Sequence, residues 1–248
     1  MKFIVIVLCL LSERFLVRTS FHNRFHWFDV YSQAMERAVS RLSSLPWVIL
    51  FCSLIPMLLV LFLALHFFSN GLFGIVGLFL NILVFYACMG PGNPFYPIRI
   101  PSEETSSTQD IRRYLTRMNG ELFAVIFWYT ILGPLAVLAY RLLSLSEPHP
   151  LVSRVAAMTV QSLDWLPSRM TALLYMLVGN FQAARGRFIA LFLTAPSENA
   201  RLLRECGSEA LGLGEDQSKT IQDAETLVEH ALIALLVWMA CFTLVAWI

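Results

Sequence analysis

The chain has 248 residues, of which 57% are hydrophobic and 14% are charged, and its formal net charge at neutral pH is +1. A soluble domain usually carries about a quarter charged residues, so water is not the main solvent of this chain. Such a small net charge, with basic residues scattered among acidic ones, excludes an electrostatic surface for nucleic acid. The five cysteines include no CxxC pair, so their spacing predicts no metal site.

Four apolar stretches are long enough to cross roughly 30 Å of hydrocarbon at about 1.5 Å per residue. They cover residues 46–68, 71–89, 122–140 and 231–248, and none of them contains Lys, Arg, Asp or Glu. Two weaker runs, 3–11 and 170–181, are too short to span alone and could be re-entrant or interfacial helices. We therefore expect an all-α, polytopic integral membrane protein, with residues 1–248 forming one membrane domain in the lipid bilayer.

The segment 12–45 is basic and ends in an amphipathic pattern. From Phe28 to Leu45 the apolar residues recur every three or four positions, and Glu36, Arg37 and Arg41 take the opposite face. This pattern predicts a helix in one of two places, on the membrane surface or packed against the other helices.

Arginine placement predicts the orientation of the first two spans. Five arginines precede residue 46 and four lie within 90–118, namely Arg14, Arg18, Arg24, Arg37 and Arg41, then Arg99, Arg112, Arg113 and Arg117. Because positive loops stay in the cytoplasm, we expect 12–45 and 90–118 to be cytoplasmic. Residues 46–89 then form a hairpin, with its Ser69-Asn70 turn on the far side.

The region 119–195 is predicted to be helical with an interruption at Gly133-Pro134. Two topologies remain open here: the run 122–140 crosses the membrane, or it re-enters and returns to the cytoplasm. Residues 196–229 form an acidic polar connection, expected to be solvated and helical with a break near 211–214. The last span then covers 230–248.

Common catalytic and cofactor motifs are missing from the sequence. The glycines of Gly90-Pro91-Gly92-Asn93-Pro94 are interspersed with prolines, which lack the N–H donors of a phosphate-binding loop, so a helix-ending turn is expected. The sequence lacks GxSxG, and the five histidines show no partner spacing. We expect no resident cofactor.

Charged and polar residues that flank the apolar runs are the candidate ligand-binding or partner-binding residues, since burying them is costly unless they pair. The set comprises Glu13, Arg14, Asn119, Glu121, Tyr140, Arg141, Asp164 and Arg169. A plainer interpretation exists for the last two. Pro167 starts a helix with Asp164 near its cap, and Trp165 and Arg169 anchor that helix at the interface.

The same residues carry a family resemblance. The sequence shows an early Glu13-Arg14-Phe15, then NGELFAVIFWYTILGPLAVLAYRLL from Asn119, then LDWLPSR from Leu163 followed by Leu177-Val178-Gly179. This pattern resembles the AmpE family of bacterial inner-membrane proteins. The resemblance implies a multi-pass inner-membrane protein that modulates β-lactamase induction or the response to cell-wall stress, with other membrane or muropeptide-recycling proteins as partners.

AmpE proteins are similar in turn to the CobD/CbiB enzymes, which form an amide bond in cobalamin synthesis. Those enzymes carry an acidic pair where this chain has Val160-Gln161, so we expect regulation rather than catalysis. We expect Arg141, Asp164 and Arg169 to share a charged pocket at the cytoplasmic interface. The alternatives are an amide-forming enzyme acting on a cofactor or cell-wall precursor, and a transporter component.

Overall fold

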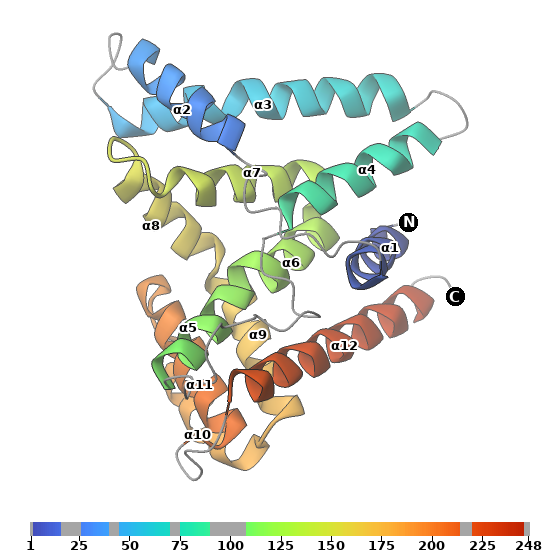
Figure 1. Ribbon diagram of the computed structural model, residues 1–248, viewed down its shortest axis with the longest axis vertical. Helices are drawn as coiled ribbons and strands as arrows, with labels where there is room; N and C mark the ends of the chain where they lie inside the picture. Colours follow the sequence, from blue (N-terminus) through green and yellow to red (C-terminus); the bar gives the residue numbers. More distant parts are fainter. Residues whose placement is uncertain are drawn as a thin grey trace. The chain divides into compact units, whose positions relative to one another are not determined.

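The computed structural model describes residues 2–15, 26–39, 45–69, 75–89, 108–213 and 220–245, and every regular element in them is a helix (Figure 1). The predicted all-α fold class is therefore confirmed for this part of the chain. Residue contacts divide the chain into two compact units. Unit 1 comprises Met1–Leu10, Val17–Pro91 and Val125–Leu163, and unit 2 comprises Leu11–Leu16, Gly92–Ala124 and Asp164–Ile248.

Unit 1 is built around α7. Its described helices are α1 (Lys2–Phe15, of which residues 2–10 belong here), α2 (His26–Val39), α3 (Pro46–Ser69), α4 (Ile75–Cys88), α6 (Ala124–Leu132), α7 (Pro134–Ser146) and α8 (Ser153–Leu163). Helix α7 packs against α3, α4 and α8, and α2 packs along α3 (Figure 1).

The apolar run 122–140 is divided, as the sequence suggested. Helix α6 ends at Leu132 and α7 begins at Pro134, with Gly133 between them at φ 89° and ψ −164°. Only glycine adopts this conformation readily, and proline suits the first turn of the next helix because no N–H is needed there. Lys2 donates to the carbonyls of Thr130 (3.1 Å) and Ile131 (3.3 Å), which the end of α6 leaves without helical partners.

The predicted amphipathic helix is α2. Its residue Phe28 is fully buried, whereas Val30 is exposed. The face of α2 that carries Phe28 therefore packs against other helices, which is one of the two places that the sequence left open. Residues 40–44, which we included in the same helix, lie outside the described residues.

Two of the described helices, α3 and α12 (Ile221–Val245), are long and apolar enough to cross a membrane. Helices α4, α6 and α7 are shorter, with 14, 9 and 13 residues. The helix that contains most of the predicted last span begins earlier than that span, at Ile221. Thr220 and Asp223 stabilise this start: the Asp223 carboxylate accepts from the Thr220 backbone N–H (2.8 Å) and hydroxyl (3.1 Å), and the first of these bonds is one half of a capping box.

Unit 2 is centred on α9. Its elements are α5 (Thr108–Met118), the π-helical turn η2 (Asn119–Phe123), α9 (Trp165–Val178), α10 (Phe181–Leu191), the 3-10 turn η3 (Pro196–Glu198), α11 (Asn199–Leu211) and α12. Helix α9 packs against α10, α11 and α12, and α5 packs against α11 and α12. Of the cytoplasmic loop predicted over 90–118, residues 108–118 are therefore a packed helix, and 90–107 lie outside the described residues.

Helix α11 corrects the prediction of a solvated acidic connection. Leu202, Leu203 and Cys206 are buried on one face of this helix, and only the other face bears exposed charges. The apolar spacing was masked by the acidic residues around it. The helix ends at Gly212 in a left-handed conformation (φ 73°), within the expected break.

Candidate functional site

The Arg169 side chain donates several hydrogen bonds within unit 2, and its residue is only 2% exposed. Its Nε donates to the Phe192 carbonyl (2.9 Å), and its Nη2 donates to the Thr194 carbonyl (2.8 Å). Its Nη1 donates to the Trp165 carbonyl (2.8 Å) and to the Asn199 side-chain oxygen. The guanidinium also lies 4.3 Å from the ring centroid of Trp165. Four of its five N–H donors thus have acceptors within the described part of the chain.

These bonds close the connection between α10 and α11. The carbonyls of Phe192 and Thr194 follow the end of α10, where a helix leaves carbonyls without partners. The Trp165 indole N–H also donates to the Thr194 carbonyl (3.0 Å). Burial lowers the pKa of Arg169 from its ordinary value, but an arginine remains protonated at neutral pH. The charge therefore fixes residues 192–199 to the first turns of α9.

Asn119 forms a second polar contact with α9. Its amide nitrogen donates to the Ser168 hydroxyl (3.3 Å), and its amide oxygen accepts from the Thr171 hydroxyl (2.8 Å). All three residues are buried. Asn119 starts the turn η2, so this bonding ties the π-helical turn to the helix that carries Arg169. Glu121 in the same turn accepts a hydrogen bond from Arg117 Nε (2.6 Å).

The predicted site residues fall into both units. Asn119, Glu121, Asp164 and Arg169 belong to unit 2, whereas Tyr140 and Arg141 belong to unit 1, where both are buried in α7. A single charged pocket that contains Arg141, Asp164 and Arg169 therefore stays a prediction. Asp164 is the N-cap residue of α9, as expected, but its side chain makes no capping hydrogen bond.

Glu13 and Arg14 complete the predicted set. Both lie in α1, and their side chains lie outside the described part of the structure.

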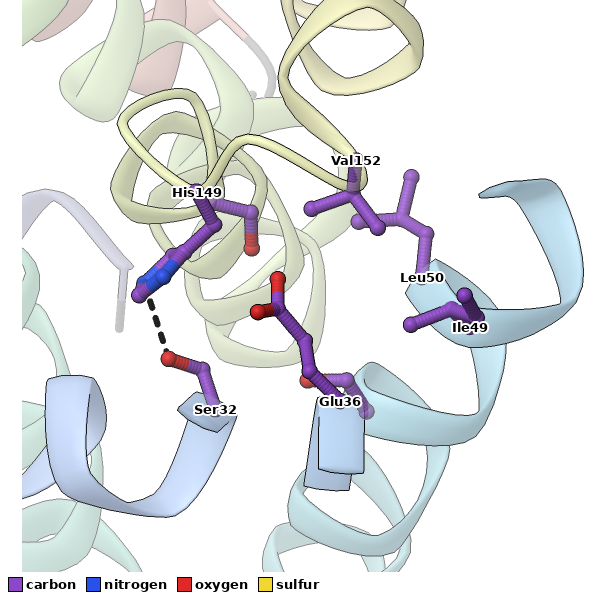
Figure 2. Close-up of a pocket in the computed structure, with 8 residues that line it drawn as sticks. Ser32, Glu36, Ile49, Leu50, His149 and Val152 are labelled. Carbon is purple, nitrogen blue, oxygen red and sulfur yellow. Dashed lines mark hydrogen bonds between the residues drawn. The ribbon is translucent and has the colours of Figure 1, made fainter. Parts of the chain in front are cut away.

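The sequence reasoning missed a pocket inside unit 1, shown in Figure 2. Its lining comes from α2, the beginning of α3, the end of α7 and the turn that follows α7, and consists of Ser32, Glu36, Ile49, Leu50, Ser53, Ser146, His149 and Val152. The Ser32 hydroxyl and His149 Nε2 are hydrogen-bonded at 2.8 Å, and the Phe28 ring meets the imidazole edge-on at 6.4 Å. The turn holds His149 because its backbone N–H donates to the Ser146 carbonyl (3.1 Å).

Glu36 is the charged member of this pocket. Figure 2 shows its carboxylate pointing into the space between His149 and Leu50. Its Oε1 is buried and has no hydrogen-bond partner among the described residues. A local signal was present in the sequence: Phe28, Ser32 and Glu36 recur every four residues, so they lie on one side of a helix. The apolar pattern predicts Glu36 on the face of the helix opposite the apolar residues.

The described residues contain no group of three or more His, Cys, Asp or Glu side chains that could hold a metal ion. Comparison with protein-family models, with curated proteins and with solved structures gives no match for this chain.

Proposed function

We propose that this chain is a multi-span regulatory protein of the bacterial inner membrane that modulates β-lactamase induction or the response to cell-wall stress, as its resemblance to the AmpE family implies. In this proposal the four apolar runs cross the membrane, with the first two forming a hairpin. The segment 119–179, which carries the resemblance, supplies the polar contacts of Asn119 and Arg169 described above.

The apolar surfaces of α3 and α12 support the membrane location. On α3, Phe51 is 53% exposed and Val60 is 68% exposed, and on α12 Phe242 is 65% exposed. Continuous exposed apolar surface on a helix of this length is costly in water and favourable in hydrocarbon. Both helices therefore have the surface expected of a lipid-contacting span.

The Arg169 network is the observation that favours regulation over catalysis. An amide-forming enzyme that used this arginine on a phosphate or carboxylate would direct its N–H donors at the substrate. Here the N–H donors of the Arg169 guanidinium are directed at the chain itself, at the carbonyls of Trp165, Phe192 and Thr194. Arg169 thus holds α9 and the start of α11 in a fixed arrangement. A rigid helical body of this kind suits recognition by a protein partner.

The proposal is tested in a strain with an inducible chromosomal β-lactamase from which the AmpE-like gene has been deleted. The chain, Arg169→Ala and Arg141→Ala are returned to this strain, and β-lactamase activity is measured before and after a β-lactam is added. Arg113→Ala is the matched control, because this arginine is largely exposed on α5. Immunoblots of membranes separate loss of function from loss of protein.

We expect the intact chain and Arg113→Ala to change the induced activity in the same direction, and both buried-arginine variants to lose that effect. The deletion strain and the complemented strain inducing equally would contradict the proposal. If the chain instead restored cobinamide synthesis in a strain that lacks its own CobD/CbiB enzyme, amide formation would replace regulation as its function.

A further inference from the structure

The pocket of unit 1 joins three parts of the fold around one carboxylate. Glu36 enters from α2, as Figure 2 shows. Ser53 of α3 and Ser146 at the end of α7 also line the pocket. The Ser32 and His149 side chains close the side where α2 meets the turn after α7. These polar groups lie beside Ile49, Leu50 and Val152, so the site is shielded by apolar side chains.

Two of the residues that line this pocket, Glu36 and Ser146, offer oxygen acceptors to it. The Ser146 hydroxyl donates to the Leu142 carbonyl (2.8 Å), so its oxygen presents lone pairs to any further partner. The buried Oε1 of Glu36 is an acceptor with no partner in the described part of the chain. A buried carboxylate oxygen left without a donor or a cation is strongly unfavourable. The pocket therefore suits a ligand that is positively charged or carries several hydrogen-bond donors.

The charge and size of the pocket limit the kind of ligand that it can bind. Neither lysine nor arginine is among the residues that line the pocket, and Glu36 is its only carboxylate. One carboxylate and neutral hydroxyl oxygens match a single positive charge better than the several anionic ligands that a tightly held divalent ion requires. The open space has room for about one water-sized guest.

The geometry points to a binding site for one small monovalent cation, either an alkali ion or ammonium, held by the Glu36 carboxylate with hydroxyl oxygens of the pocket. This site goes beyond the regulatory function proposed above. Its consequence is mechanical, because Glu36 belongs to α2 and Ser146 to α7. The bound cation links these two helices across the pocket.

The cation adds to two contacts that already hold α2. The Tyr31 hydroxyl donates to the Ser53 carbonyl (3.0 Å), and Ser32 bonds to His149. Without the cation, the buried Oε1 of Glu36 has no partner among the described residues at the same junction, which weakens the docking of α2. The packing of α2 on α3 and on the turn after α7 is thus dependent on the cation concentration.

Thermal unfolding of the purified full-length protein in detergent tests the site. Tryptophan fluorescence reports the Tm while NaCl, KCl or NH4Cl replaces N-methyl-D-glucamine chloride at constant ionic strength, the last cation being too large to enter. At ten times the dissociation constant of the cation we expect the Tm to rise by about 3–6 °C and to approach saturation. The three salts distinguish an alkali ion from ammonium.

The variants E36Q and D110N assign the effect to the pocket. The former removes the charge of Glu36 at nearly constant shape, so its Tm should not depend on the cation. The latter removes the exposed carboxylate of Asp110 on α5 and should keep the full dependence. S146A removes one oxygen from the pocket and should raise the half-saturating concentration about fivefold.

Three results would overturn the site. The first is a Tm that is equal in all four salts, and the second is a cation-dependent rise that persists in E36Q. The third is an unchanged half-saturating concentration in S146A, which decides the question if E36Q does not accumulate. None of these readouts involves β-lactamase, so failure of the cation site and failure of the proposed function are distinguishable.

Discussion

Ser32 and His149 are 117 residues apart in the chain, yet the serine hydroxyl and the imidazole Nε2 share a buried hydrogen bond of 2.8 Å. The bond connects α2 to the turn that follows α7, within unit 1. Because both side chains are buried, the bond replaces contacts with water that neither residue could otherwise recover.

Ser32→Ala should lower the free energy of unfolding by about 1–2 kcal/mol, because the imidazole loses this partner in a buried position. Ser162→Ala is the matched control, since that exposed hydroxyl bonds only the Met158 carbonyl of its own helix. Thermal unfolding of both variants checks the difference. Equal Tm values for the two variants would contradict a stabilising Ser32 to His149 bond.

Some helix ends followed from local chemistry that the sequence displays directly. The interruption at Gly133 and the end of α11 at Gly212 depend on the backbone freedom of glycine and the missing N–H of proline, which act within a few residues. The start of α12 at Ile221 also depends on residues close to it in the sequence. We missed it because the charges after Thr220 were assigned to a solvated connection, although Thr220 and Asp223 form a recognisable cap.

The polar contacts could not be obtained in this way, because they depend on how helices pack. Asn119 contacts Ser168 and Thr171, which lie about fifty residues further along the chain. The periodicity of one sequence does not show which residues of two distant helices face each other. For Arg169 the sequence indicated a polar residue at a helix entry. That its acceptors are the carbonyls after α10 became visible only in the folded chain.

Arg169→Lys should destabilise the protein by about 2–4 kcal/mol, because an ammonium group cannot reach three carbonyls and the Asn199 amide with a planar fork. Arg113→Lys, at an exposed position, should change the free energy of unfolding by less than about 0.5 kcal/mol. Unfolding in a graded mixture of mild detergent and dodecyl sulfate measures both. A lysine variant as stable as the parent would show that the planar guanidinium of Arg169 does not contribute to the free energy of unfolding.

Cys206 should resist alkylation in the folded protein. Burial, followed by the nearby charges of Glu205 and Glu209, raises the pKa of this thiol from 9.0 to about 12. The thiolate fraction at pH 8 therefore falls by about a thousandfold, and the thiolate is the reactive form. Peptide mass mapping after N-ethylmaleimide treatment measures the rate. Labelling of Cys206 at the same rate in folded and denatured protein would contradict the burial of α11.

Glu147, which follows α7, should make stability depend on pH. Burial raises the pKa of this carboxyl above its ordinary value of 4.5, so the folded state binds the proton more tightly than the unfolded state. The stability gained from protonation is complete below pH 4.5 and is lost as the pH rises through the raised pKa. Glu147→Gln should remove this loss, giving a higher Tm than the parent at pH 7 and an equal one near pH 4. A parent and variant with parallel pH profiles would contradict the shift.

Membrane insertion is the property on which the proposed function depends most. Alkaline phosphatase, which is active only outside the cytoplasm, can be fused after residue 69 and after residue 118, and its activity measured in intact cells. The hairpin orientation predicts high activity for the fusion after 69 and little for the fusion after 118, at equal protein levels. Equal, low activity at both positions, with both fusions extracted from membranes by alkaline carbonate, would contradict a membrane-spanning α3.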